Sequence, residues 1–284
     1  MKPPARPFAA SMPKAARRLR PERDPSAPAG PLRPRPGRSA ALRRPMVRFI
    51  EVPVEGLDAR LDGVRIAHLS DVHVSALTRP RLLERAVRRI AECGAELALL
   101  TGDYVCLSPK PLPRLAEALR RLAVPSLATL GNHDHWAGAE AVERALVSAG
   151  IDVLRNEHRT VLLRGAPLHV VGIDDGSTRH ADIERAFASV PADGLRVALT
   201  HDPRQADRAA PLGAALILAG HTHGGQVNVP VITRRLMRRR GFDRLGGEYR
   251  VGDALLYVSR GLGASLPVRL RAPSEIAILT LRQA

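Results

Sequence analysis

The sequence predicts an α/β fold, in which the strands of a parallel sheet alternate with helices. Short apolar runs recur in the first half of the chain, and each is followed by a longer segment whose apolar residues are spaced for one buried helix face. After residue 150 the apolar runs become shorter and lie closer together, as is typical of hairpins and of antiparallel or mixed sheets. These observations predict two sheets with helices packed against them.

Three strand–helix units make up the first half of the predicted fold. In the first unit, an apolar run at 64–69 precedes a helix at 80–92, where Leu83, Val87 and Ile90 share one face. Parallel neighbours need a crossover connection, which a helix usually supplies, so the repeat of this unit predicts parallel strands. The other units are strand 96–101 with helix 112–123 and strand 125–130 with helix 138–149.

The second half of the chain is predicted to be mostly β-structure. Short apolar segments bounded by turn-forming residues come first, and longer apolar runs follow. The expected hairpin-like segments are 151–154, 160–164 and 168–173, and the expected later strands are 195–200, 214–219, 254–259 and 275–281. These strands would complete the second sheet.

Side chains that can bind a metal through oxygen or nitrogen recur at the ends of the apolar runs. They occur in five blocks, which are Asp71-Val72-His73, Gly102-Asp103, Gly131-Asn132-His133-Asp134, Thr200-His201-Asp202 and Gly220-His221-Thr222-His223-Gly224-Gly225. Residues just past the end of a strand lie in loops, where side chains from several strands can turn toward one point. The five blocks therefore predict one shared site.

The donor types indicate a pair of metal ions. A carboxylate has two oxygens and can bridge two ions, so Asp103 is the natural shared ligand. Imidazole nitrogen is favoured by zinc, iron and other transition metals rather than by calcium. We therefore expect two divalent metal ions, with manganese, iron and zinc all compatible with this set of ligands.

The five blocks, in this order, resemble the pattern of the calcineurin-like metallophosphoesterase superfamily: DxH, GD, GNHD, a lone His and GHxH. Segments 102–105, 220–226 and 257–263 are similar to the bacterial YkuE and YaeI type, a branch that also includes lipid A pathway pyrophosphatases. The resemblance covers residues 47–284. It implies the metallophosphoesterase fold, a four-layer α-β-β-α sandwich of two mixed β-sheets flanked by helices.

The resemblance also implies a role for each residue of the site. One ion would be held by Asp71, His73, Asp103 and His223, and the other by Asp103, Asn132, His201 and His221. His133 would be a catalytic partner that protonates or stabilises the leaving group, and the carboxylate of Asp134 is expected to orient the His133 ring.

These roles predict a metal-dependent phosphoric ester hydrolase. Two divalent ions lower the pKa of a bridging water, and the resulting hydroxide can attack phosphorus in a phosphodiester or pyrophosphate bond. A lipid-linked substrate such as an acylated nucleotide sugar would suit the lipid A branch. The alternative is a nuclease or nucleic-acid-binding phosphoesterase, suggested by the net charge of +16. Nucleic acid is the less favoured partner, because aromatic residues make up only 3% of the chain.

Residues 1–46 are predicted to be a disordered, basic, Pro-rich tail that precedes a single domain at 47–284. Residues 1–48 contain 13 of the 44 Lys and Arg residues, two acidic residues and 11 of the 24 prolines. Such a segment cannot bury enough apolar surface to offset its ordering entropy. No apolar run suits a secretory signal or a membrane span, and there are only two cysteines, so we expect a cytoplasmic location.

The segment that follows the last metal block combines basic and apolar residues. Its five arginines are Arg234, Arg235, Arg238, Arg239 and Arg240. Two interpretations have equal weight at this point. The segment either makes peripheral contact with an anionic membrane surface, at the inner face of the membrane, or forms a solvated basic face. No obligate protein partner is indicated.

Overall fold

The computed structural model describes residues 45–75, 78, 80–265 and 268–284. The predicted basic tail, residues 1–46, lies outside these residues except for Pro45 and Met46. The first strand begins at Met46, one residue before the predicted start of the domain.

Two six-stranded mixed sheets form the centre of this domain. The order in the first sheet is β1 (Met46–Val54), β12 (Glu275–Gln283), β2 (Arg65–Leu69), β3 (Leu97–Thr101), β4 (Ser126–Thr129) and β5 (Asp152–Val153). The order in the second is β10 (Gly247–Val251), β11 (Ala254–Val258), β9 (Leu216–Ala219), β8 (Leu195–Leu199), β7 (Ala166–Gly172) and β6 (Glu157–Leu163). The β12–β2, β10–β11 and β6–β7 pairs are antiparallel, and the other pairs are parallel.

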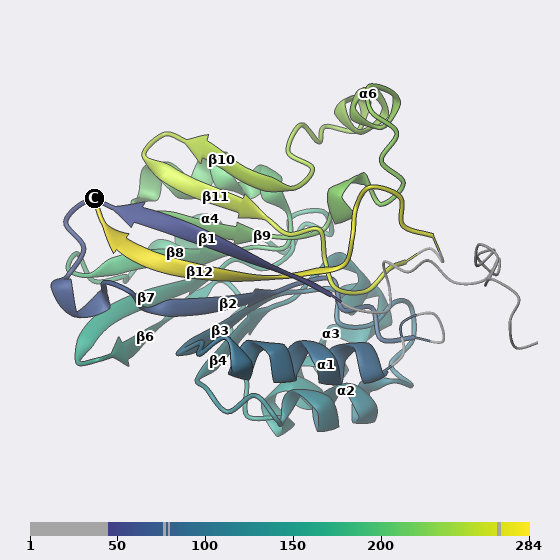
Figure 1. The fold of residues 1–284 in the computed structure, drawn as a ribbon, viewed down its shortest axis with the longest axis horizontal. Helices are drawn as coiled ribbons and strands as arrows, with labels where there is room; N and C mark the ends of the chain where they lie inside the picture. The colour runs from purple at the N-terminus through teal and green to yellow at the C-terminus, as the bar shows by residue number, and fades with distance from the viewer. Residues whose placement is uncertain (1–44, 76–77, 79, 266–267) are drawn as a thin grey trace, which may run out of the picture. The chain divides into compact units, whose positions relative to one another are not determined.

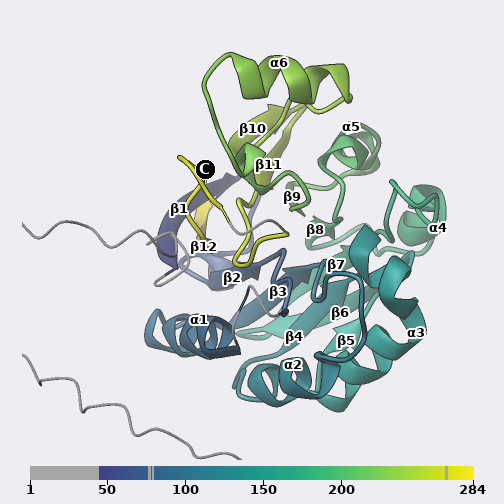
Figure 2. The same ribbon diagram turned by 90° about the vertical axis from the view of Figure 1, so that its right-hand side faces the viewer.

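Helices cover the outer faces of both sheets (Figures 1 and 2). The first sheet is covered by α1 (Pro80–Glu92), α2 (Leu112–Leu119) and α3 (Asn132–Ser148). The second is covered by α4 (Ile183–Phe187) and α5 (Ala206–Ala209). The sixth helix, α6 (Ile232–Arg239), stands away from the sheets in Figure 1. In the described residues, four short 3-10 turns complete the elements, at Ala59–Leu61, Pro203–Gln205, Ala210–Leu212 and His223–Gly225.

Strand β3 shows how the sequence produces these layers. All five of its residues are buried, as expected for a parallel strand covered on both faces. Leu97 and Leu99 belong to the core between the two sheets, whereas Ala98 and Leu100 belong to the core beneath α1 and α2. Because side chains alternate across a strand, a continuous apolar run fills both layers at once. The predicted four-layer sandwich is confirmed.

The structure confirms the predicted strands and helices of the first half within a few residues, with one difference. Helix α3 begins at Asn132 rather than at 138, and Gly138 interrupts it with a φ of 110°. The helix therefore starts inside the metal block Asn132-His133-Asp134. The glycine marks the point at which the expected regular helix begins.

Several elements were missed by the sequence pattern. They are β1, β10 and the short helices α4, α5 and α6. The strand expected at 275–281 exists as β12, but its predicted place in the second sheet is wrong, because it pairs with β1 and β2 in the first. Strand β1 is an edge strand in which Ile50, Val52 and Val54 face inward while exposed Arg48 and Glu51 interrupt the apolar run. None of the helices in the described part of the chain combines the length and the apolar character needed to cross a membrane.

Candidate metal centre

The predicted ligands lie at the carboxyl ends of five strands. They follow β2, β3 and β4 of the first sheet and β8 and β9 of the second. Within each of these two groups the strands are parallel, so their carboxyl ends meet at one edge of the sheet. The two edges meet at His201, whose Nδ1 lies 2.7 Å from the carbonyl oxygen of Thr101 at the end of β3. The site is therefore built across both sheets.

The backbone at the site adopts an uncommon conformation. Five of the seven predicted ligands have φ in the left-handed region: Asp71 (50°), His73 (45°), Asp103 (58°), His221 (72°) and His223 (52°). For residues other than glycine this conformation costs about 1 kcal/mol each, and it persists only where the surrounding structure holds it. The strain is concentrated where the chain leaves β2, β3 and β9.

Close packing of backbone against the carboxylates requires glycine at two positions. A Cβ on Gly220 would overlap the side chains of Ser70 and Asp71, and a Cβ on Gly131 would overlap Asp103. The loop after β9 therefore lies directly against Asp71. This contact lets the backbone N–H of His221 donate to both oxygens of Asp71, at 3.1 and 3.2 Å.

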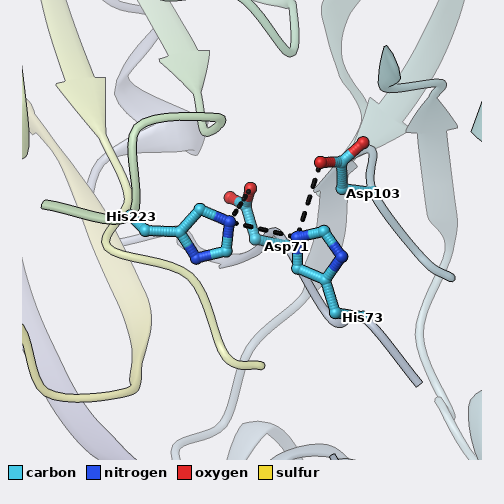
Figure 3. A group of neighbouring side chains, drawn as sticks. All are labelled: Asp71, His73, Asp103 and His223. Carbon is cyan, nitrogen blue, oxygen red and sulfur yellow. Dashed lines mark hydrogen bonds and ion pairs between the residues drawn. The ribbon is translucent and has the colours of Figure 1, made fainter. Parts of the chain in front are cut away.

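Asp71, His73, Asp103 and His223 form a compact buried group (Figure 3). One donor atom from each side chain lies within 4.8 Å of all the others. The two Nε2 atoms of His73 and His223 are 3.0 Å apart, Nε2 of His73 is 3.5 Å from Oδ2 of Asp103, and Nε2 of His223 is 3.3 Å from Oδ1 of Asp71. Two carboxylates and two ring nitrogens around one point form a ligand set for a divalent cation.

The remaining predicted ligands meet on the other side of Asp103. Nε2 of His201 is 3.2 Å from Oδ2 of Asp103, which is the same oxygen that faces His73. Nδ1 of His221 lies 2.9 Å from Oδ1 of Asn132, and the rings of His201 and His221 lie edge to face with centroids 5.0 Å apart. Asp103 thus stands between the two predicted ligand groups.

The contacts of His201 provide a test of whether a cation fits. A carbonyl oxygen can only accept, so the contact with Thr101 places the ring hydrogen of neutral His201 on Nδ1. Its buried Nε2 has no hydrogen-bond partner among the residues that the structure describes, and it presents a lone pair toward Asp103. Two electron-rich groups in this arrangement need a cation between them or a proton on the ring. Burial lowers the pKa of His201, but the Asp103 carboxylate overrides burial and raises this pKa well above its usual value. The donor set fits a metal ion.

His223 has a buried arginine against its other ring nitrogen. Nη2 of Arg269 lies 3.1 Å from Nδ1 of His223, and the guanidinium also donates to the carbonyl oxygens of Arg260, Gly263 and Ala272. Arginine can only donate, so Nδ1 accepts and the hydrogen of neutral His223 lies on Nε2. For neutral His223 to bind a metal through Nε2, this hydrogen would have to move to Nδ1, the nitrogen that faces the guanidinium.

Burial and neighbouring charge set the protonation of the two carboxylates in opposite directions. Burial raises the pKa of Asp71 to about 6, the positive charge of His201 opposes this rise, and the charge of Asp103 adds to it. Burial alone would raise the pKa of Asp103 too, but His201 and His73 hold it well below its usual range. The carboxylate shared by both groups is therefore the one most firmly ionised.

His133 is half-buried beside the first group. Its Nδ1 lies 2.8 Å from the carbonyl oxygen of Cys106, so Nδ1 carries the hydrogen and Nε2 is left available for acid or base chemistry. The ring lies edge to face with His73, with centroids 4.8 Å apart, and packs against Trp136. The backbone N–H of His133 donates to Oδ1 of Asp103 at 2.9 Å.

The expected contact between Asp134 and the His133 ring is not formed. The carboxylate of Asp134 is buried and accepts backbone N–H groups of Gly131 (2.9 Å), Asp103 (2.7 Å), Tyr104 (2.9 Å) and Val105 (3.4 Å). Burial and the charge of Asp103 raise the pKa of Asp134 to about 7, and the N–H donors oppose this rise. Asp134 therefore links the loops after β3 and β4. The His133 ring is oriented by the carbonyl of Cys106 rather than by the Asp134 carboxylate.

Comparison with known proteins identifies the family. Residues 64–235 match the model of the calcineurin-like phosphoesterase superfamily domain. The chain belongs to this superfamily. Its matched region contains all seven predicted ligands, and the family is one of hydrolases of phosphoric esters.

Three curated relatives cover most of this calcineurin-like phosphoesterase. The uncharacterized metallophosphoesterase YkuE of Bacillus subtilis is 31% identical over 78% of this chain and 80% of its own length. Phosphodiesterase YaeI of Escherichia coli is 29% identical over 76% of this chain and 82% of its own length. The UDP-2,3-diacylglucosamine pyrophosphatase LpxG of Chlamydia trachomatis is 25% identical over 78% of this chain and 84% of its own length.

A solved structure supports the fold alone. The 5'-nucleotidase precursor of Thermus thermophilus superposes with a TM-score of 0.50 at 16% identity, covering 76% of this chain and 54% of that chain.

Two residues at the site were not found from the sequence. Ser70 donates to Oδ2 of Asp71 at 2.6 Å, and Arg269 contacts His223. Ser70 directly precedes a predicted ligand, so proximity was an available signal. Sγ of Cys106 also lies at the site, 3.6 Å from Nδ1 of His73. Arg269 is 46 residues from His223 and belongs to no metal block.

Proposed function

We propose that this protein hydrolyses a phosphodiester or pyrophosphate bond with two divalent metal ions. The observation that carries the proposal is the position of Asp103, whose Oδ2 faces His73 at 3.5 Å and His201 at 3.2 Å. A carboxylate between two groups of nitrogen and oxygen donors is the arrangement that a bridged metal pair requires. The metals expected are manganese, iron or zinc.

The chain's own residues divide the work as follows. Asp71, His73, Asp103 and His223 would hold one ion, and Asp103, Asn132, His201 and His221 the other. When bound, such ions activate water and neutralise the charge of the phosphoryl oxygens. His133 presents Nε2 at the edge of this centre with its Nδ1 fixed on Cys106, so a protonated His133 can donate to the leaving oxygen. Asp134 would act indirectly, by holding the Asp103 loop.

A lipid-linked substrate is the finer part of the proposal. The relative LpxG is named for a diacylated nucleotide sugar, and YaeI for a phosphodiester. In this chain, the loop that leaves α6 returns to the site, where the ring of Phe242 lies 5.0 Å from that of His221. The segment from Gln226 to Phe242 therefore borders the metal centre, where it can contact the part of the substrate beyond the phosphate.

Peripheral contact with an anionic membrane surface is proposed for the same segment. Seven large apolar side chains are exposed on α6 and its neighbouring loops: Val227, Val229, Val231, Ile232, Leu236, Val268 and Leu270. The backbone bridge between Val227 and Leu270 places the two loops side by side. Apolar side chains interspersed with Arg234, Arg235, Arg238, Arg239 and Arg240 are typical of surfaces that bind anionic lipids.

A panel of substrates tests the proposed function. The metal-reconstituted protein would be assayed with aryl monoesters and diesters, cyclic nucleotides, phospholipids, and nucleoside diphosphate sugars with and without acyl chains. We expect hydrolysis of diesters or diphosphates and a preference for acylated forms. Activity that ignores acyl chains would remove the lipid-linked part, and the absence of any metal-dependent hydrolysis would contradict the function as a whole.

A further inference from the structure

A large pocket lies beside the metal centre, between α6 and the loop that leads into β10. Its volume is about 1040 Å³. None of the seven predicted metal ligands is among the residues that line it, although Gly224, the neighbour of His223, is. The pocket is therefore adjacent to the metal centre and separated from it by the loop after β9.

The pocket is strongly basic. Five arginines and one aspartate carry its charge: Arg234, Arg235, Arg238, Arg239, Arg260 and Asp243. Arg238 is paired with Asp243 at 2.9 Å, and Arg260 with Glu275 at 2.8 Å. Among the residues that the structure describes, the other three arginines have no acidic partner within 4.0 Å. The pocket therefore has an uncompensated positive charge.

Helix α6 gains little stability from the rest of the domain. Of its eight residues only Thr233 is buried, and its hydroxyl donates to the carbonyl of Val227 and accepts from the N–H of Val229. Arginines at i and i+4, which are 234 with 238 and 235 with 239, place like charges beside each other and destabilise a helix. An anion bound in the pocket would remove this repulsion.

At its base, the pocket contacts the loop after β9, which carries His221 and His223. The side chain of Arg260 passes against Gly224 and Gly246, where an added Cβ would lie 2.9 and 3.1 Å from its Cγ. Thr222, between the two histidines of the metal block, donates to the carbonyl of Leu245 at 2.8 Å. The chain thus leaves the loop after β9, forms α6 and returns to contact the same loop. A group bound in the pocket would therefore lie next to a group bound at the metal centre.

We propose that this pocket binds a phosphate group that is distinct from the phosphate hydrolysed at the metal centre. Guanidinium groups match phosphate oxygens in a two-pronged geometry, and several of them converge here with one acid among them. The second phosphate belongs either to a soluble diphosphate or to the headgroup of an anionic phospholipid. The inference extends the proposed function, on which it rests, by naming a second phosphate site beside the metal centre that is filled separately from it.

The test uses the full-length, metal-loaded protein and methylenediphosphonate, a diphosphate analogue whose P–C–P bridge cannot be hydrolysed. Isothermal titration calorimetry should show two binding events in the unmodified protein, one at the metals and one in the pocket. The variant is the triple substitution R234Q/R235Q/R239Q, in which glutamine keeps the helix propensity of arginine. The matched control is R81Q/R88Q/R114Q, which removes the same charge from exposed positions on α1 and α2.

We expect the α6 variant to lose the pocket event, with affinity weakened at least about tenfold, while the control retains both events. An event that survives in the α6 variant, or that weakens equally in the control, would overturn the inference. If the unmodified protein shows no binding of methylenediphosphonate at the metal centre, that result would instead count against the proposed function. Circular dichroism checks that both variants remain folded.

Sedimentation with vesicles identifies the source of the phosphate. Vesicles of phosphatidylcholine with phosphatidylglycerol are compared with vesicles of phosphatidylcholine alone. Binding that requires phosphatidylglycerol and is lost in the α6 variant assigns the pocket to lipid headgroups, and a calorimetric pocket event without vesicle binding assigns it to a soluble diphosphate. Phosphate recognition is contradicted if neither phosphatidylglycerol-dependent vesicle binding nor calorimetric binding in the pocket is seen. It is also contradicted if both kinds of vesicle bind equally and calorimetry shows no binding in the pocket.

Discussion

His201 and Asp103 meet across the two sheets, with Nε2 of His201 3.2 Å from Oδ2 of Asp103. The histidine follows β8 of the second sheet, and the aspartate follows β3 of the first. The same carboxylate oxygen faces His73 at 3.5 Å. Because Asp103 is the shared member of both groups, its removal should affect the whole centre rather than one half of it.

Asp103→Asn is expected to abolish metal binding together with activity. An amide has a single acceptor oxygen and no charge, so it cannot bridge two cations. Loss of a ligand should reduce activity by at least about 100-fold, since even the loss of a group that only orients a ligand costs 10- to 100-fold. Metal content measured by mass spectrometry and hydrolysis of an aryl diester provide the check. The control is Asp152→Asn at an exposed position, and full metal content in D103N would refute the bridging role.

His133→Ala is expected to retain metal and to lose turnover. The ring lies beside the ligands without belonging to either group, and loss of a general acid typically reduces kcat by about 10²- to 10⁴-fold. The loss should be greater for an alkyl leaving group than for p-nitrophenolate, which leaves without a proton. His158→Ala, at a half-buried position in the edge strand β6, is the control. Equal losses with both leaving groups would exclude the acid role.

Asp134→Asn is expected to destabilise the loops of the site. The carboxylate accepts four backbone N–H groups, and an amide would turn its own N–H₂ toward some of them. Buried donors left without an acceptor should lower the free energy of unfolding by about 3 kcal/mol. Urea denaturation and metal content should both change. A variant of unchanged stability that loses only kcat would show instead that Asp134 acts in the chemical step.

The stability of the domain is expected to fall on acidification because of His68. Burial lowers the pKa of His68 from 6.5 to about 3 in the folded state. Between these values the unfolded chain binds a proton that the folded protein does not, so this contribution to stability is complete above pH 6.5 and decreases as the pH falls toward 3.

The expected slope from His68 alone is about 1.4 kcal/mol per pH unit across that window. Urea denaturation of the full-length protein in chelator, at a series of pH values, would measure it. His68→Gln should show a shallower dependence between pH 4 and pH 6 than the unmodified protein, after both are referred to their stability at about pH 8, where the histidine is neutral in both states. Parallel curves would show that His68 does not contribute.

Much of the fold was predictable because its strands are buried on both faces. Strands such as β3 are apolar over four of their five residues and buried throughout, and the helices between them carry regular apolar faces. The elements that the sequence did not reveal lack one of these signals. Strand β1 has exposed charged residues and, among the described strands, pairs only with β12 from the other end of the domain, and α6 buries only one side chain. Long-range pairing, rather than local composition, places such elements.

The candidate site was predictable in its members and less so in their contacts. The structure brings the seven predicted donors of the five blocks together, because side chains past the ends of parallel strands converge at one edge. The partner of His133 could not be deduced, because Asp134 is its neighbour in the sequence whereas Cys106, whose carbonyl makes the contact, is 27 residues away. In the structure, the oxygens of Asp134 accept four backbone N–H groups, and the ring of His133 donates to the carbonyl of Cys106 instead.

By itself, the sequence determined the class of fold, the candidate donor set and the family to which the chain belongs, since apolar periodicity and the order of the metal blocks are local properties. Only the tertiary structure decided that Asp103 stands between His73 and His201, that Arg269 contacts His223, and that the arginines of α6 surround a pocket beside the metal loop. These relationships join residues that are up to about 100 positions apart, and packing of the two sheets against each other is what brings them together.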